Sequence, residues 1–159
     1  MLNESDWKSL SAEMQTIELK QSEILFHPAT PIQKVYFPIN CLVSLITVFE
    51  DGASAEMATV GFEGAVDIRA VLGSGLTTTE HIVQVPGLAL ATDSDSFQKS
   101  RVDLMSFNDA LQQYVQAFTT HVLQSVACNA VHSVRSRAAK WLLLCQDRNG
   151  TDTFPITQQ

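Results

Sequence analysis

Apolar residues recur at intervals of three and four along residues 104–131, the pattern of an amphipathic helix. The stretch from Ser106 to Val131 contains neither Gly nor Pro, so one helix of about 26 residues and about 39 Å is expected. A helix of this length extends beyond a small domain, so part of its apolar face needs another partner. A second copy of the chain is the simplest one. The residues expected at this dimer interface are Phe107, Leu111, Tyr114, Val115, Phe118, Val122 and Val126.

A second helix is expected after a joint at His132 and Ser133. Ser133 is a favoured N-cap residue, because its side chain can accept a hydrogen bond from a free N–H group of the first turn. The helical pattern then continues through Trp141 to Cys145. His132 and Ser133 are therefore expected to form a hinge between two helices.

Residues 16–92 follow a different pattern, in which short runs rich in β-branched and aromatic residues alternate with turn residues. Strands are expected over residues 16–20, 24–26, 34–37, 42–49, 53–60, 81–85 and 88–92, and short helices over 4–14 and 93–100. Asp51-Gly52 suits a type I′ hairpin turn and Pro86-Gly87 suits a type II turn. The fold class predicted is mainly β with flanking helices, an antiparallel β-roll or jelly roll followed by a long helix.

Four glycines interrupt this pattern of strands and turns between residues 61 and 75. They bracket residues 65–72, which are expected to form a short helix inside the roll. A helix that begins beside Gly64 would point free backbone N–H groups between the sheets, where an anion can bind. Composition alone leaves open the alternative that these glycines only form turns.

Composition and charge narrow the classes of partner. The 159 residues are 45% hydrophobic, enough for one domain with a core. The net charge is -7, and four of the ten Lys and Arg residues follow position 132, so most of the chain is a poor partner for nucleic acid. No secretory signal and no run of about 18 apolar residues is found, which predicts a cytoplasmic protein without membrane contact.

Cysteine and histidine spacing argues against a metal centre or a catalytic group. Cys41, Cys128 and Cys145 are widely spaced, which predicts reduced, buried thiols rather than disulfides or a zinc site. His121, Cys128 and His132 share one helical stripe, but the two histidines lie about 16 Å apart along a helix and cannot hold one ion. Polar edging of the dimer interface is the interpretation preferred for this stripe. No spacing favours a nucleophile with its base, or paired carboxylates, so no enzyme activity is expected.

Several short segments together resemble one bacterial family. They are Val35-Tyr36-Phe37-Pro38, Val43-Ser44-Leu45, Asp51-Gly52, Val60-Gly61-Phe62-Glu63-Gly64, Val83-Gln84-Val85-Pro86-Gly87, His132-Ser133-Val134 and Ala139-Lys140-Trp141-Leu142-Leu143. With the order of the expected elements, they resemble the Crp/Fnr family of transcriptional regulators, named for the cyclic-AMP receptor protein and the fumarate-nitrate regulator. The resemblance covers essentially the whole chain.

The resemblance implies three regions: a cyclic-nucleotide-binding-like sensor roll over residues 1–103, a dimerisation helix over 104–131, and a hinge over 132–159 that starts a winged helix-turn-helix. It implies a homodimer that contacts DNA only through that C-terminal domain. The sequence ends where Thr157 would cap the first helix of the domain, so a truncated form is expected.

The resemblance also implies where an effector would bind. Cyclic-nucleotide sensors of the family carry a Gly-Glu step, an Arg-Ser/Thr step and a Thr-Ser pair in the long helix. In this sequence Ala65 follows Gly64, no Arg lies in residues 77–80, and Val122-Leu123 replace the Thr-Ser pair. Cyclic AMP is therefore not expected, and the effector is unknown. The expected effector pocket is Gly61, Glu63, Gly64, Ala65, Thr78, Thr79, Val122 and Leu123.

The function expected is that of a sensor and dimerisation region of a DNA-binding transcriptional regulator. A free-standing nucleotide-binding-like module that regulates a partner protein is the alternative. A cupin-type metalloenzyme needs closely spaced His residues on facing strands, and the four scattered His residues do not supply them.

Overall fold

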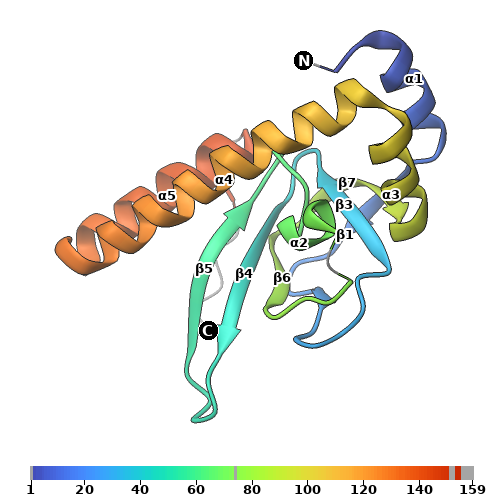
Figure 1. The fold of residues 1–159 in the computed structure, drawn as a ribbon. Coiled ribbons are helices and arrows are strands. Elements are labelled where there is room, and N and C mark those ends of the chain that lie inside the picture. The colour runs from blue at the N-terminus through green and yellow to red at the C-terminus, as the bar shows by residue number, and fades with distance from the viewer. Residues whose placement is uncertain (1, 74, 151–152, 155–159) are drawn as a thin grey trace.

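The computed structural model describes residues 2–73, 75–150 and 153–154. Figure 1 shows a β-roll with one long helix lying across it and a second helix beside the first. The elements in chain order are α1 (Glu4–Ala12), β1 (Gln15–Leu19), β2 (Ile24–Phe26), β3 (Lys34–Pro38), β4 (Leu42–Val48), β5 (Ser54–Val60), α2 (Ile68–Leu72), β6 (Glu80–Val85), β7 (Gly87–Asp93), α3 (Ser94–Asp103), α4 (Met105–Val131) and α5 (Val134–Asn149).

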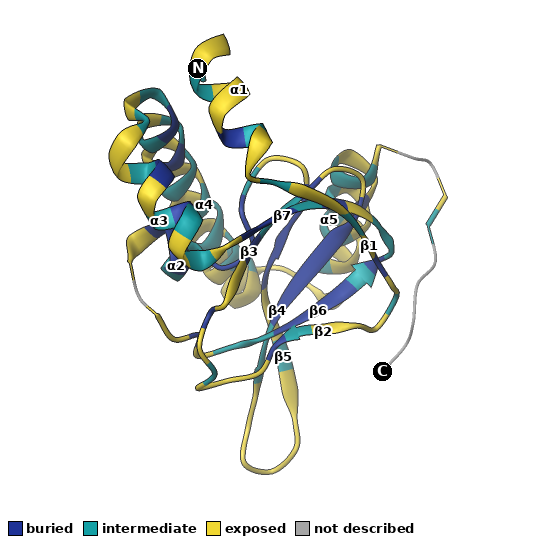
Figure 2. Ribbon diagram, turned by 90° about the vertical axis from the view of Figure 1, so that its right-hand side faces the viewer, coloured by how far each residue is buried: buried dark blue, intermediate teal, exposed yellow. Residues whose placement is uncertain are grey.

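The strands form two antiparallel sheets, as the sequence predicts. One has the order β1-β7-β3 and the other β2-β6-β4-β5. Each expected strand appears with bounds within one residue of those predicted. Side chains alternate between the faces of a strand, and the buried ones include Val35, Val43, Val60 and Val83. Figure 2 shows the buried residues on the strands between the sheets, while the tip of the β4–β5 hairpin is exposed.

The β4–β5 hairpin is confirmed, but its turn type differs from the prediction. Gly52 has φ of 84°, and Asp51 is not among the residues with positive φ. A type I′ turn needs positive φ at both central residues, so the prediction of that type was wrong. The loop closes when Phe49 N donates to Ala53 O at 2.8 Å and Gly52 N donates to Phe49 O at 3.0 Å.

The Pro86-Gly87 step does not form the predicted type II turn either. The chain changes sheets here, because β6 pairs with β2 and β4 whereas β7 pairs with β1 and β3. Gly87 is not among the glycines with positive φ, which a type II turn requires at this position. A Cβ atom on Gly87 would lie 2.6 Å from Asn40 O. Glycine is needed for this close backbone approach.

Helix α1 packs beside the start of α4 and supplies its cap. The carboxylate atom Asp6 Oδ2 accepts hydrogen bonds from Ser106 N at 3.2 Å and from Ser106 Oγ at 2.6 Å. A negative group at a helix N-terminus is favourable because free N–H groups and the helix dipole meet there. The N-terminal helix α1 is therefore joined to the first turn of α4 by a capping interaction.

Helices α4 and α5 form an antiparallel pair joined at the predicted hinge (Figure 1). His132 leaves the helical conformation with φ of -101° and ψ of 147°. Ser133 caps α5, its Oγ accepting from Ser136 N at 3.2 Å. Lys140 Nζ donates to Ser125 Oγ at 3.2 Å, which links the two helices. No helix among the described residues is long and apolar enough to span a membrane.

Candidate functional site in the β-roll

The short helix α2 begins later than the sequence suggests. It was expected over residues 65–72 beside Gly64, but it spans Ile68–Leu72 and its N-cap is Asp67. Asp67 has φ of 66°, unusual for a residue other than glycine, and its Oδ1 atom accepts from Arg69 N at 2.9 Å. The chain's own carboxylate therefore occupies the place expected for a bound anion.

Asp67 belongs to a buried polar cluster that also contains Arg69 and His81. Asp67 is 1% exposed and His81 is fully buried. His81 Nε2 lies 3.8 Å from Asp67 Oδ2, and Arg69 Nε lies 3.8 Å from Asp67 Oδ1. Arg69 Nη2 donates to Thr79 Oγ1 at 3.5 Å. The positive charge of Arg69 thus faces a carboxylate from its own helix rather than a vacant site.

Several polar atoms of this cluster have no hydrogen-bond partner among the described residues. They are Asp67 Oδ2, Arg69 Nη1 and both ring nitrogens of His81. Burial lowers the pKa of His81, and the nearby Asp67 carboxylate opposes part of this effect. Burial disfavours a charged imidazole, so His81 is neutral at pH 7. The described residues contain no group of three or more His, Cys, Asp or Glu side chains that could hold a metal ion.

The expected effector pocket is not assembled as one site, because its first four residues lie beneath α4 and α5. Glu63 Oε1 accepts from Gly61 N at 3.2 Å and pairs with Arg148 Nε at 2.9 Å. Ala65 O accepts from Tyr114 Oη at 3.0 Å, and the Tyr114 ring covers Gly64 so closely that a Cβ atom there would lie 2.0 Å from Tyr114 Cε2.

The other four residues of that expected pocket lie elsewhere. Thr79 contacts Arg69 in the buried cluster, and Thr78 is exposed. Val122 is half-buried on α4, while Leu123 is 66% exposed. Seven of the eight residues therefore divide among the contacts of α4 and α5 with the roll, the Asp67 cluster and α4 itself, and Thr78 lies on the surface.

The expected dimer stripe also divides into two parts. Phe107 and Leu111 are buried in the core of the chain itself, and Tyr114, Val115 and Phe118 pack against that core. Their own roll therefore covers Phe107 and Leu111, which leaves little of either side chain for a second copy to contact. Further along, Val126 is 57% exposed and Val122 is half-buried.

Sequence reasoning missed how α5 docks on the roll. Trp141 Nε1 donates to Glu56 Oε1 at 2.8 Å, and Arg148 Nη1 donates to Thr59 O at 2.7 Å and to Thr59 Oγ1. Cys145 is buried against Leu42 and Val85. The available signal for a docked helix face was the spacing of four and then three residues between Trp141, Cys145 and Arg148.

His121 and Cys128 turn toward α5 rather than toward the edge of a dimer interface. Both line a cavity between α4, α5 and β5, whereas His132 is exposed at the hinge. The antiparallel packing of α5 against α4 determines this orientation, which cannot be predicted from helix periodicity alone.

Comparison with known proteins supports the fold. The chain matches no protein-family model and no curated protein. It is similar to the structure of CLP, a c-di-GMP-responsive global regulator of Xanthomonas campestris, with a TM-score of 0.72, 14% identity, and coverage of 88% of this chain and 70% of that one.

Two single-domain structures are also similar. The N-terminal domain of a transcriptional regulator from Streptomyces coelicolor has a TM-score of 0.59 and 20% identity, covering 84% of this chain and 91% of that one. A cyclic nucleotide-binding domain from Methylobacillus flagellatus has a TM-score of 0.68 and 11% identity, covering 84% and 77%. The chain therefore has the fold of a cyclic-nucleotide-binding domain, followed by the long helix α4.

Proposed function

We propose that this chain is the sensor and dimerisation region of a bacterial DNA-binding transcriptional regulator. Residues 1–103 form the sensor roll, residues 104–131 the dimerisation helix, and residues 132–159 the hinge and the start of a DNA-binding domain. Its fold, shared with the N-terminal domain of a regulator and with a global regulator, supports this proposal.

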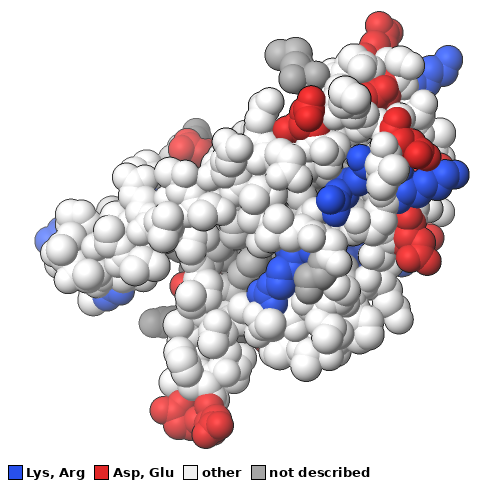
Figure 3. All heavy atoms as spheres, in the orientation of Figure 1, with Lys and Arg blue, Asp and Glu red and all other residues white. Residues whose placement is uncertain are grey.

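The outer face of α4 carries the proposal. Thr119, Leu123, Val126 and Ala130 are exposed and separated by four, three and four residues, so they lie along one side of the helix. Asp109 is the one charged residue among the 27 of α4, apart from the titratable His121. Figure 3 shows the corresponding pale surface along the helix. A neutral, partly apolar stripe of this length fits a second copy of the same helix.

Helix α5 supplies the means of transmission. It follows the hinge at His132 and docks on the roll through Trp141 and Arg148. A change in the roll that favours or weakens this docking would move whatever follows α5. In a dimer, two such movements would change the distance between the two DNA-binding domains. This distance determines which pairs of half-sites the two domains can bind at the same time.

DNA contact is assigned to residues beyond α5. A chain with net charge -7 repels a duplex at long range, and specific binding needs a helix that reads base edges in the major groove. None of α1 to α5 is proposed for that role. We do not expect the effector to be cyclic AMP, because the N-terminus of α2, where an anion could bind, is capped by the Asp67 carboxylate.

A chimera tests the proposed function. The 159-residue chain is fused at Gln159 to a winged-helix head that binds its palindromic operator only as a dimer. Fluorescence anisotropy should show operator binding by the fusion, and Leu123→Glu should weaken it by at least about tenfold through a charge buried at the seam. A fusion that binds no better than the isolated head would contradict the proposal and favour a free-standing module.

A further inference from the structure

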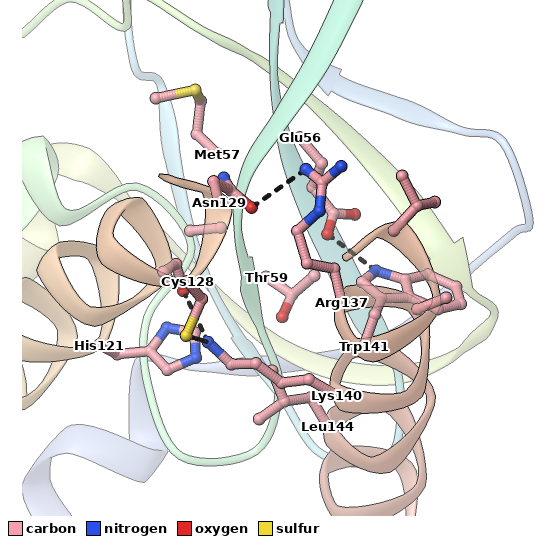
Figure 4. A pocket seen from close by; sticks show the side chains of 14 residues that line it. Glu56, Met57, Thr59, His121, Cys128, Asn129, Arg137, Lys140, Trp141 and Leu144 are labelled. Carbon is pink, nitrogen blue, oxygen red and sulfur yellow. Dashed lines mark hydrogen bonds between the residues drawn. The ribbon is translucent and has the colours of Figure 1, made fainter. Parts of the chain in front are cut away.

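A cavity of about 380 Å³ lies between β5, the C-terminal half of α4 and α5, apart from the Asp67 cluster in the roll. Figure 4 shows side chains from all three elements converging on it. Small-molecule sites commonly have volumes of about 300–1,000 Å³ and mostly apolar walls. The apolar part of this wall is formed by Met57, Ala58, Val134, Ala138, Trp141 and Leu144.

Two basic side chains face this cavity without a carboxylate partner among the described residues. Among the described residues, Lys140 Nζ donates hydrogen bonds to Ser125 Oγ at 3.2 Å and to Cys128 Sγ at 3.8 Å. Arg137 Nη1 donates to Asn129 Oδ1 at 3.4 Å, and its Nε atom is buried without a hydrogen-bond partner. A buried cationic donor that lacks an anionic partner is costly, so an anion here would be favourable.

The acidic residue of the cavity wall, Glu56, does not neutralise these cations. Its Oε2 atom accepts from Ser44 Oγ at 2.7 Å and its Oε1 atom accepts from Trp141 Nε1 at 2.8 Å. Figure 4 shows the Glu56–Trp141 pair at one end of the cavity and Lys140 with Cys128 and His121 at the other. The Lys140 end is therefore electrostatically positive.

His121 completes this end of the cavity. Both of its ring nitrogens are buried without a hydrogen-bond partner among the described residues. Every tautomer of imidazole has at least one N–H donor. A carboxylate oxygen placed between His121 and Lys140 would satisfy a donor of each side chain.

We propose that this cavity is a binding site for a small organic carboxylate. The carboxylate group lies between Lys140 and His121, and an apolar or aromatic body packs against Met57, Leu144 and Trp141 toward the end of the cavity that holds Arg137. Because the walls come from β5, α4 and α5, occupancy favours the docked position of α5. This site requires neither a dimer nor DNA, so its test is independent of the proposed function.

A charged and a neutral ligand of the same shape test the proposal. 1-Naphthaleneacetate and 1-naphthaleneacetamide are titrated calorimetrically into the 159-residue chain. The carboxylate should bind one per chain with a dissociation constant below about 1 mM, and the amide at least about tenfold more weakly. Equal affinities, or no saturable binding of the carboxylate, would overturn the proposal.

Matched variants locate the site. Lys140→Gln should weaken naphthaleneacetate binding by about tenfold or more. Arg137→Gln should have a smaller effect, because the Arg137 guanidinium lies at the Asn129 end of the cavity. Arg135→Gln makes the same charge change on the same helix at an exposed residue outside the cavity wall, and it should bind as the wild type does. Circular dichroism establishes that each variant is folded. An equal effect of Lys140→Gln and Arg135→Gln would reject the assigned site.

Alkylation of Cys128 gives a second measurement without an added ligand. Cys41 and Cys145 are buried, whereas Cys128 is half-buried beside Lys140. Mass spectrometry measures how fast Cys128 reacts with anionic iodoacetate and with neutral iodoacetamide. The ratio of the iodoacetate rate to the iodoacetamide rate should fall in Lys140→Gln, because the positive charge that attracts the carboxylate reagent is lost. An unchanged ratio would contradict a positive site.

Discussion

Trp141 on α5 donates the hydrogen bond of its indole Nε1 to Glu56 Oε1 on β5 at 2.8 Å, across 85 residues of sequence. Ser44 Oγ donates to the other carboxylate oxygen at 2.7 Å. Burial raises the pKa of Glu56, and these two donors oppose the effect. Docking of α5 therefore stabilises an ionised carboxylate that the sheet alone would leave with one donor.

Replacing Trp141 should weaken this docking in a pH-dependent way. Trp141→Phe removes one of the two donors to the Glu56 carboxylate, which should cost about 0.5–1.5 kcal/mol in free energy of unfolding at pH 7. A raised pKa means that the folded chain holds the Glu56 proton more tightly, so the stability contribution falls as pH rises through the folded pKa. The Trp141 donor opposes this loss because it favours the ionised carboxylate. The cost of Trp141→Phe should therefore shrink near pH 4.5, where less of the carboxylate is ionised.

Urea denaturation followed by circular dichroism measures this effect. Trp7→Phe is the matched control, because Trp7 on α1 is 46% exposed. A Trp141→Phe cost that is the same at both pH values, or no larger than that of Trp7→Phe, would show that the indole does not stabilise the carboxylate.

Gly64 should tolerate no side chain while Tyr114 is present. A Cβ atom would lie 2.0 Å from Tyr114 Cε2, and the ring is held by the hydrogen bond from its hydroxyl to Ala65 O. Gly64→Ala should lose about 1–3 kcal/mol of stability, and less when Tyr114 is already replaced by Leu. Gly75→Ala, where nothing lies within 4 Å, is the control and should be close to neutral in thermal denaturation.

His81 should make stability depend on pH. Burial lowers its pKa below the ordinary 6.5, so the folded chain binds this proton more weakly than the unfolded chain. The contribution of neutral His81 to folding stability is present above pH 6.5 and is lost as pH falls toward the pKa of His81 in the folded chain. Between pH 7 and 5, His81→Gln should flatten the slope of unfolding free energy by up to about 1.4 kcal/mol per pH unit. A slope equal to that of wild type in urea titrations would exclude His81 as the source.

Cyclic nucleotides should bind weakly. Their phosphate would meet the buried Asp67 carboxylate at the start of α2, and unpaired or like charges in such a site cost several kcal/mol. We expect dissociation constants above about 100 μM for cyclic AMP and cyclic GMP by calorimetry. A low-micromolar constant would mean that Asp67 rearranges on binding.

Local signals in the sequence predicted most of the fold. The strand Ile24–Phe26, the hairpin at Gly52 and the cap at Ser133 depend on residues close to one another in the chain. Turn chemistry, side-chain alternation and capping are read from such short stretches. They predict where an element begins and ends.

The candidate site could not be predicted in the same way, because it depends on contacts between distant residues. The pairing of Arg148 with Glu63 joins α5 to the roll, and periodicity shows a helix face without showing what covers it. The same limit explains why Phe107 was expected at an interface and lies in the core. The role of Asp67 could not be predicted, because a positive φ is usual for glycine and the sequence does not show that Asp67 adopts one.

The mass of the chain in solution tests the central claim that α4 is a dimerisation helix. Multi-angle light scattering at tens of micromolar should give about twice the 17.5 kDa chain mass. Leu123→Glu or Val126→Glu should give the monomer mass, because a charge would be buried at the seam, whereas Val102→Glu, at an 84% exposed position on α3, should remain dimeric. A monomeric wild-type chain, or a Leu123→Glu variant that keeps the dimer mass, would contradict the account.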